Sequence, residues 1–239
     1  MRAAGVALLL SACAAFTEAP AVLGAEREQA GALGRQRLLS AWNELRGDAY
    51  PLDAVDRWLE PGQRVSCDAR GMVAYRGSAL RYAGSVLVYP AFRERLARFE
   101  EVAVATGREV YGREPRLVRH YGAFVCRATR NRKLRVSEHA LGNALDLVGF
   151  DFAAATKAQP LPEGLPKRLR SPFQVRVAKH FKAAPGSGEL DALHTQFLRR
   201  LTERLRERDD IFRSMFGPGH GGHDDHLHLD AAPFRYVDL

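Results

Sequence analysis

The feature that most constrains the fold is a histidine-rich segment near the C-terminus, HGGHDDHLHLD at 220–230. It holds four of the chain's eight histidines. Histidine and carboxylate side chains are common ligands of catalytic zinc, which takes three protein ligands and keeps one position open. His226 and His228 are two residues apart, so in a strand they would point to the same face. We therefore expect a fold that brings this segment against ligands from elsewhere in the chain.

A second segment, SEHALGNALD at 137–146, offers such ligands. His139 and Asp146 are seven residues apart, which on one helix would separate them by about 10 Å, too far to share an ion. Gly142 lies between them and permits a turn, so a loop histidine and a strand aspartate can converge. The residue types alone leave open whether His226 or His228 completes the site.

The rest of the pattern mixes strands and helices without a regular βαβ alternation, which favours an α+β fold. An amphipathic helix is predicted after Pro90, with Phe92 and Phe99 on its apolar face and its end at Gly107. A loop over 153–188 is expected to border the functional cleft. The predicted strands lie at 72–77, 85–90, 143–152 and in HLHLD, an extended segment at 116–126, and further helices at 38–45, 53–59 and 190–205.

The N-terminus resembles an export signal, because Arg2 is followed by a short apolar run. LSAC, ending at Cys13, is similar to the lipobox of bacterial lipoproteins, whose cysteine carries lipid. The alternative is ordinary cleavage after Ala25. The expected organisation is an export signal over 1–25, a linker with a helical extension over 26–65 and one catalytic-type domain over 66–239. The expected location is the periplasm, with or without a lipid anchor to a membrane.

Export changes the expectation for the two remaining cysteines, because disulfides persist in an oxidising compartment. We predict that Cys67 pairs with Cys126, and two free buried thiols are the alternative. The formal net charge is +8, which suits an acidic partner such as a cell-wall polymer. No nucleic-acid-binding motif accompanies the basic residues, so nucleic acid is not an expected partner.

The two segments together resemble a family signature. The pattern S-x-H-x-x-G-x-A-x-D followed downstream by H-x-H is similar to that of the LAS zinc peptidases, which include D-alanyl-D-alanine carboxypeptidases and the Hedgehog signalling domain. Within that superfamily, GAFVCR before SEHALGNALD resembles the extensin-like C-terminal family of bacterial exported proteins. HDDHLH is also similar to a stretch of the penicillin-insensitive murein endopeptidase. The resemblance covers about 67–235 and implies a small antiparallel sheet that carries the metal ligands, flanked by helices.

The resemblance implies that His139, Asp146 and His228 bind zinc and that His226 transfers protons. It also implies supporting roles for two further residues. His223 would orient water or His226, and Arg127 would polarise the scissile carbonyl or hold a substrate carboxylate. The implied function is a zinc metallopeptidase acting on peptidoglycan peptides, as an endopeptidase or a D-alanyl-D-alanine carboxypeptidase. The alternative is a zinc-containing, non-catalytic domain that binds the cell wall.

Two departures from related enzymes bear on the mechanism. The chain has no H-E-x-x-H motif, so the glutamate base of the common zinc peptidases is missing. Many carboxypeptidases place a glutamate three residues before the last ligand, where this chain has Asp225, and this favours histidine-assisted endopeptidase chemistry. Asp225 is expected either to fix an imidazole tautomer or to form a turn. His220 is predicted to be a loop residue outside the site.

Overall fold

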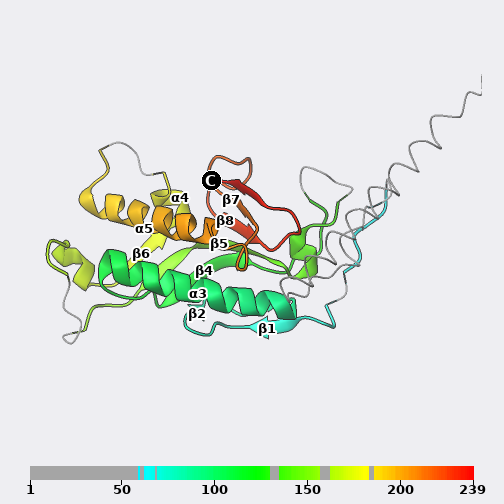
Figure 1. Ribbon diagram of the computed structural model, residues 1–239, viewed down its shortest axis with the longest axis horizontal. Helices are drawn as coiled ribbons and strands as arrows, with labels where there is room; N and C mark the ends of the chain where they lie inside the picture. The colour runs from blue at the N-terminus through cyan, green and yellow to red at the C-terminus, as the bar shows by residue number, and fades with distance from the viewer. Residues whose placement is uncertain (1–58, 60–61, 68, 130–134, 157–161, 183–185) are drawn as a thin grey trace, which may run out of the picture.

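The computed structural model describes residues 59, 62–67, 69–129, 135–156, 162–182 and 186–239. These residues form a mixed α+β fold, as predicted, with a two-stranded sheet, a seven-stranded sheet and two long helices (Figure 1). The predicted export signal, Cys13, the helix expected at 38–45 and, except for Leu59, the helix expected at 53–59 lie outside the described residues. None of the helices in the described part of the chain is both long and apolar enough to span a bilayer.

The elements follow one another along the chain in this order. They are β1 (Val73–Tyr75), β2 (Arg81–Tyr82), β3 (Val86–Val88), α3 (Pro90–Tyr111), β4 (Leu117–Gly122), the 3-10 helix η1 (Glu138–Leu141), β5 (Ala144–Phe152), the 3-10 helix η2 (Lys167–Arg170), β6 (Phe173–Arg176), α4 (Val177–His180), α5 (Glu189–Arg206), β7 (Ser214–Phe216), β8 (Leu227–Asp230) and β9 (Tyr236–Asp238).

The larger sheet has the order β2-β4-β5-β8-β7-β9, with β6 paired to β5. Its inner pairs are antiparallel, whereas β2–β4 and β7–β9 are parallel, so the sheet is mixed. The small antiparallel sheet consists of β1 and β3 and carries none of the predicted ligands. The prediction that a small antiparallel sheet carries them was therefore wrong, because the short strands at both edges enlarge the ligand-bearing sheet.

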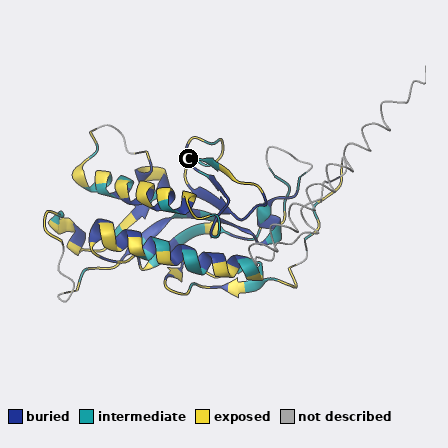
Figure 2. Cartoon of the chain, in the orientation of Figure 1, coloured by how far each residue is buried: buried dark blue, intermediate teal, exposed yellow. Residues whose placement is uncertain are grey.

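Helices α3 and α5 pack against each other and supply much of the core. The predicted apolar face of α3 is confirmed, since Phe92 and Phe99 are fully buried. Figure 2 shows the same division along both helices, with buried residues on one side and exposed residues on the other.

The predicted end of α3 at Gly107 was wrong, because the helix continues to Tyr111 and ends where Gly112 adopts φ 68°. Gly107 is buried inside the helix. A Cβ there would lie 2.8 Å from the carbonyl oxygen of Arg113 and from Cδ of Pro115. The glycine therefore permits a close approach of the chain that follows the helix, and the stop comes from Gly112.

Cys67 and Cys126 form a disulfide with a Cα–Cα distance of 5.8 Å, which confirms the predicted pairing. The bond ties the segment before β1 to the segment after β4. Beside it, the backbone carbonyl of Arg127 accepts a hydrogen bond from the Ser137 N–H, at 3.1 Å. The disulfide thus lies next to the hydrogen bond that positions Ser137 at the start of η1.

Candidate metal centre

Asp146 and His228 lie directly opposite each other on the antiparallel strands β5 and β8. The neighbouring pair Leu145 and Leu229 is fully buried in the core. Side chains alternate along a strand, so Asp146 and His228 project from the other face of the sheet. The alternation of HLHLD thereby turns one face toward the core and the other toward the site.

His139 reaches the same place from the 3-10 helix that precedes β5. Ser137 caps that helix by accepting a hydrogen bond from the His139 N–H. Gly142 ends it with φ 63°, and a Cβ at this position would lie 2.8 Å from the backbone nitrogen of Tyr89. The predicted glycine turn is confirmed, and it folds His139 back over Asp146.

Three ligand atoms meet at this point and form a group that could hold a metal ion. Nε2 of His139 lies 3.1 Å from Oδ1 of Asp146 and 3.1 Å from Nδ1 of His228. The remaining side of the triangle, between His228 Nδ1 and Asp146 Oδ1, is 3.0 Å. Tetrahedral zinc with bonds of about 2.0–2.1 Å would place its ligands about 3.3 Å apart. The triangle fits such an ion with a small expansion.

In His139 and His228, the outer ring nitrogen, which points away from the triangle, lies within hydrogen-bond distance of an acceptor. His139 Nδ1 lies 2.8 Å from the carbonyl oxygen of Ala123, and His228 Nε2 lies 2.9 Å from Oδ2 of Asp230. Both outer nitrogens must therefore carry the hydrogen. In a neutral ring the inner nitrogen, which faces the triangle, then carries a lone pair and no hydrogen. Three electron-pair donors thus face one another at about 3 Å and require a positive charge between them.

The pKa values express the same demand for positive charge. Burial lowers the pKa of His228, but hydrogen bonds to Asp146 and Asp230 outweigh burial and raise this pKa to about 9. Burial raises the pKa of Asp146, yet hydrogen bonds to His139 and His228 hold it well below its usual range. The pocket therefore attracts a cation even when that cation is only a proton.

His226 lies beside the triangle, with its Nε2 3.6 Å from Oδ1 of Asp146. Its Nδ1 is 2.8 Å from Oδ1 of Asp225, and the hydroxyl of Tyr121 donates to Oδ2 of the same carboxylate at 2.7 Å. Hydrogen bonds to His226 and Tyr121 lower the pKa of Asp225, so it stays ionised. Asp225 therefore fixes the tautomer of His226, which leaves Nε2 as a proton acceptor toward the site.

A cavity of about 470 Å³ opens over the triangle. Arg127, His223 and His220 all line it, so His220 belongs to the site wall, contrary to the prediction. Its Nδ1 lies 2.8 Å from Oδ2 of Asp238. Burial, followed by the neighbouring imidazoles of His228 and His226, lowers the pKa of His223 to about 4, so this ring is neutral at pH 7.

Other residues of the cavity differ from the sequence-based expectation. None of the described residues in 153–188 lines it, so the prediction that this loop borders the cleft was wrong. The segment forms η2, β6 and α4 and lies at another part of the sheet. His180 and His194 are buried with ring centroids 4.7 Å apart, and neither lines the cavity.

Sequence reasoning missed two supporting residues, Asp230 and Tyr121. Asp230 had a signal, because it follows His228 at the two-residue spacing that shares one strand face. Tyr121 had none, since it reaches Asp225 from a position 104 residues away. Its ring also packs against His226, with centroids 5.6 Å apart.

Comparison with known proteins places the chain in a family. The family described as "Extensin-like protein C-terminus" matches residues 54–198, which is more than half of the 239 residues. The match includes His139 and Asp146 and ends before β8. No curated protein and no solved structure matches the chain. The chain therefore belongs to the extensin-like protein C-terminus family.

Proposed function

We propose that the protein is a zinc-dependent metallopeptidase that hydrolyses peptide bonds in peptidoglycan, with a fold related to the LAS peptidases. The observation that carries the proposal is the convergence of His139 Nε2, Asp146 Oδ1 and His228 Nδ1 within 3.1 Å, with both histidine tautomers fixed from outside. Two imidazoles and one carboxylate are a donor set that suits catalytic zinc. Zinc at such a site supplies a Lewis acid that acidifies water and polarises a carbonyl.

In this mechanism His226 acts as the proton-transfer group. Its Nε2 faces the site as an acceptor because Asp225 holds the opposite nitrogen at 2.8 Å. A ring held in this way can take a proton from the attacking water and deliver it to the leaving amine. The carboxylate of Asp225 stabilises the charged imidazolium, and Tyr121 orients that carboxylate.

Arg127 and His223 have supporting roles in the proposal. Both line the cavity over the triangle. The guanidinium of Arg127 would stabilise charge on the scissile carbonyl oxygen or hold a substrate carboxylate. His223 is neutral at pH 7, and its Nδ1 is buried without a hydrogen-bond partner among the described residues. The part of the ring that lines the cavity would orient water or substrate.

The cavity rim suits an extended, acidic substrate. Phe234 and Tyr236 line the cavity and are among the few large apolar side chains that are exposed in the described part of the chain. Arg135 and Arg235 line it too. Aromatic faces and guanidinium groups together match peptides that carry carboxylates and are linked to sugar rings. The proposed location is accordingly the periplasm, with Cys13 as the point of lipid attachment if the protein is anchored.

A digest of purified muropeptides with the zinc-loaded protein tests the proposal. We expect release of shorter peptides or D-alanine, and a loss of at least a hundredfold in rate for His226→Ala, on the scale of general acid–base catalysis. Metal content and circular dichroism of this variant should remain unchanged, because His226 is outside the triangle. If the loaded protein releases no product, the alternative function as a non-catalytic zinc domain that binds the cell wall replaces the peptidase.

A further inference from the structure

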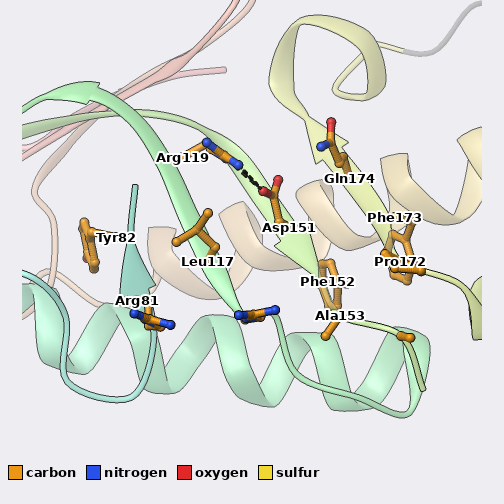
Figure 3. Close-up of a pocket in the computed structure, with 12 residues that line it drawn as sticks. Arg81, Tyr82, Leu117, Arg119, Asp151, Phe152, Ala153, Pro172, Phe173 and Gln174 are labelled. Atoms are coloured by element: carbon orange, nitrogen blue, oxygen red, sulfur yellow. Dashed lines mark hydrogen bonds and ion pairs between the residues drawn. The ribbon is translucent and has the colours of Figure 1, made fainter. Parts of the chain in front are cut away.

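A second cleft of about 830 Å³ lies on the sheet away from the candidate metal centre (Figure 3). Its walls come from β2, β4, β5 and β6, and it shares no lining residue with the cavity over the triangle. Asp151 lines the cleft, whereas Asp146 belongs to the candidate metal centre. The two residues are five positions apart on β5, which corresponds to about 16 Å along the strand. The two sites are therefore separate.

Strand register aligns four of the cleft residues across the sheet. Arg81 is paired with Leu117, Leu117 with Asp151, and Asp151 with Gln174, so the four side chains form a row across four strands. Backbone hydrogen bonds place Arg116, the residue before Leu117, between Arg81 and Asp151. Its carbonyl accepts from the Arg81 N–H at 3.3 Å, and its own N–H donates to the Asp151 carbonyl at 2.8 Å. The backbones of Arg81 and Arg116 are thus held next to each other, and both residues line the cleft.

The acidic residues near these arginines are already paired with other arginines. Glu114, which lines an adjoining cavity with both of them, is bound to Arg108. Asp151 is the only acidic residue lining the cleft among the described residues, and it already binds Arg119 and Arg176, each at 2.6 Å. Neither Arg81 nor Arg116 has an acidic partner among the residues that the structure describes, and both are exposed. Like charges that are held together without counter-charges create a positive potential that attracts anions.

The opposite wall is apolar and firmly braced. Phe152 and Phe173 stack at 4.5 Å between centroids, and Figure 3 shows them with Pro172 on the side away from Arg81. The buried guanidinium of Arg113 lies 4.7 Å from the ring centroid of Phe173 and donates to the carbonyl of Ala153 at 2.9 Å. Because Phe152 is buried, the apolar surface of the cleft comes from Phe173 and Pro172, opposite the two arginines.

We propose that this cleft binds an anionic ligand, with its carboxylate or phosphate groups at Arg81 and Arg116 and its carbon skeleton against Phe173. Guanidinium groups bind both kinds of anion through paired N–H donors. The site goes beyond the proposed peptidase function and involves none of the candidate metal ligands.

Calorimetric titration of the purified protein at low salt tests this site, with tricarballylate as the carboxylate probe and inorganic phosphate as the phosphate probe. The protein is first stripped of metal with chelator and dialysed, so that neither probe can bind through an ion. We expect saturable binding of at least one probe and a loss of at least tenfold in affinity for the double variant Arg81→Gln, Arg116→Gln. Binding of one probe but not the other identifies the anionic group.

The matched control is the double variant Arg64→Gln, Arg199→Gln, which removes the same charge from exposed positions outside the cleft. It should bind the probe as the unaltered protein does. Equal weakening in both double variants would overturn the proposal, because binding would then follow total charge. The absence of saturable binding for both probes would overturn it too. Since the protein is free of metal, neither result depends on whether it is a peptidase.

Discussion

Removal of Asp230 should weaken zinc binding although Asp230 is not itself one of the three ligands. Its Oδ2 accepts the hydrogen of His228 Nε2 at 2.9 Å, and this bond turns the lone pair of Nδ1 toward the triangle. Asp230 is buried, with 3% of its surface exposed, so little solvent competes with this bond in the unaltered protein. Asp230→Ala therefore leaves Nε2 of His228, a candidate metal ligand, without its acceptor and no longer fixes the tautomer of this ring.

The size of the effect follows from the bond that is lost. A hydrogen bond to a charged group contributes about 1.5–3 kcal/mol, and losing it corresponds to a Kd for zinc that is about 10–100-fold higher. Asp230 also accepts a bond from the Ala232 N–H at 2.9 Å, so part of the loss could arise from the backbone. Asp230→Asn separates the two contributions, because it keeps the side-chain volume and one acceptor oxygen, and its Kd should lie between those of the alanine variant and the unaltered protein.

Competition titration against a zinc-binding dye at pH 7.5 measures these Kd values. Asp225→Ala is the matched control, because Asp225 contacts His226 and none of the three ligands. Its Kd should stay within about threefold of the unaltered protein. Equal Kd values for Asp230→Ala and Asp225→Ala would refute the reasoning that the outer hydrogen bond prepares His228 for the metal.

Three further predictions concern stability, each measured by urea unfolding. Glu100 is fully buried and accepts hydrogen bonds from the Tyr75 hydroxyl and three consecutive backbone N–H groups, so Glu100→Ala should cost about 3–4 kcal/mol. A cost under about 1 kcal/mol would contradict this account. Burial, followed by the neighbouring His180, lowers the pKa of His194 to about 4. Its contribution is therefore complete above the unfolded pKa of about 6.5 and is lost as the pH falls toward 4, by about 1–2 kcal/mol between pH 7 and pH 5. His194→Phe should reduce this loss, and an unchanged slope would exclude His194 as its source. Reduction of the Cys67–Cys126 disulfide, which closes a loop with a sequence separation of 59, should cost about 4 kcal/mol, and an unchanged unfolding midpoint would contradict this.

The sequence predicted the parts of the site that depend on local pattern. Gly142, between His139 and Asp146, predicted the turn. The alternation of HLHLD predicted which side chains share a face of the strand. Periodicity also located the apolar face of α3. These signals are read within one element, so no knowledge of the tertiary fold is needed.

The parts that the sequence did not reveal depend on contacts between distant segments. Gly107 appeared to end a helix, but its role is a close approach to the chain around Arg113. Tyr121 supports Asp225 across 104 residues, and no local pattern marks such a pair. The edge strands β2 and β9 have two and three residues, too few for an alternation to be recognised. The number of strands in the larger sheet therefore could not be predicted from the sequence.

The most direct test of the central claim is the zinc content of the purified protein, measured by mass spectrometry after dialysis. We predict one zinc per chain for the unaltered protein, and less than about a tenth of that for His139→Ala. The control is His220→Ala, which alters the wall of the same cavity without touching the triangle and should retain its zinc. Zinc retained in His139→Ala, or lost equally in both variants, would contradict a centre formed by His139, Asp146 and His228.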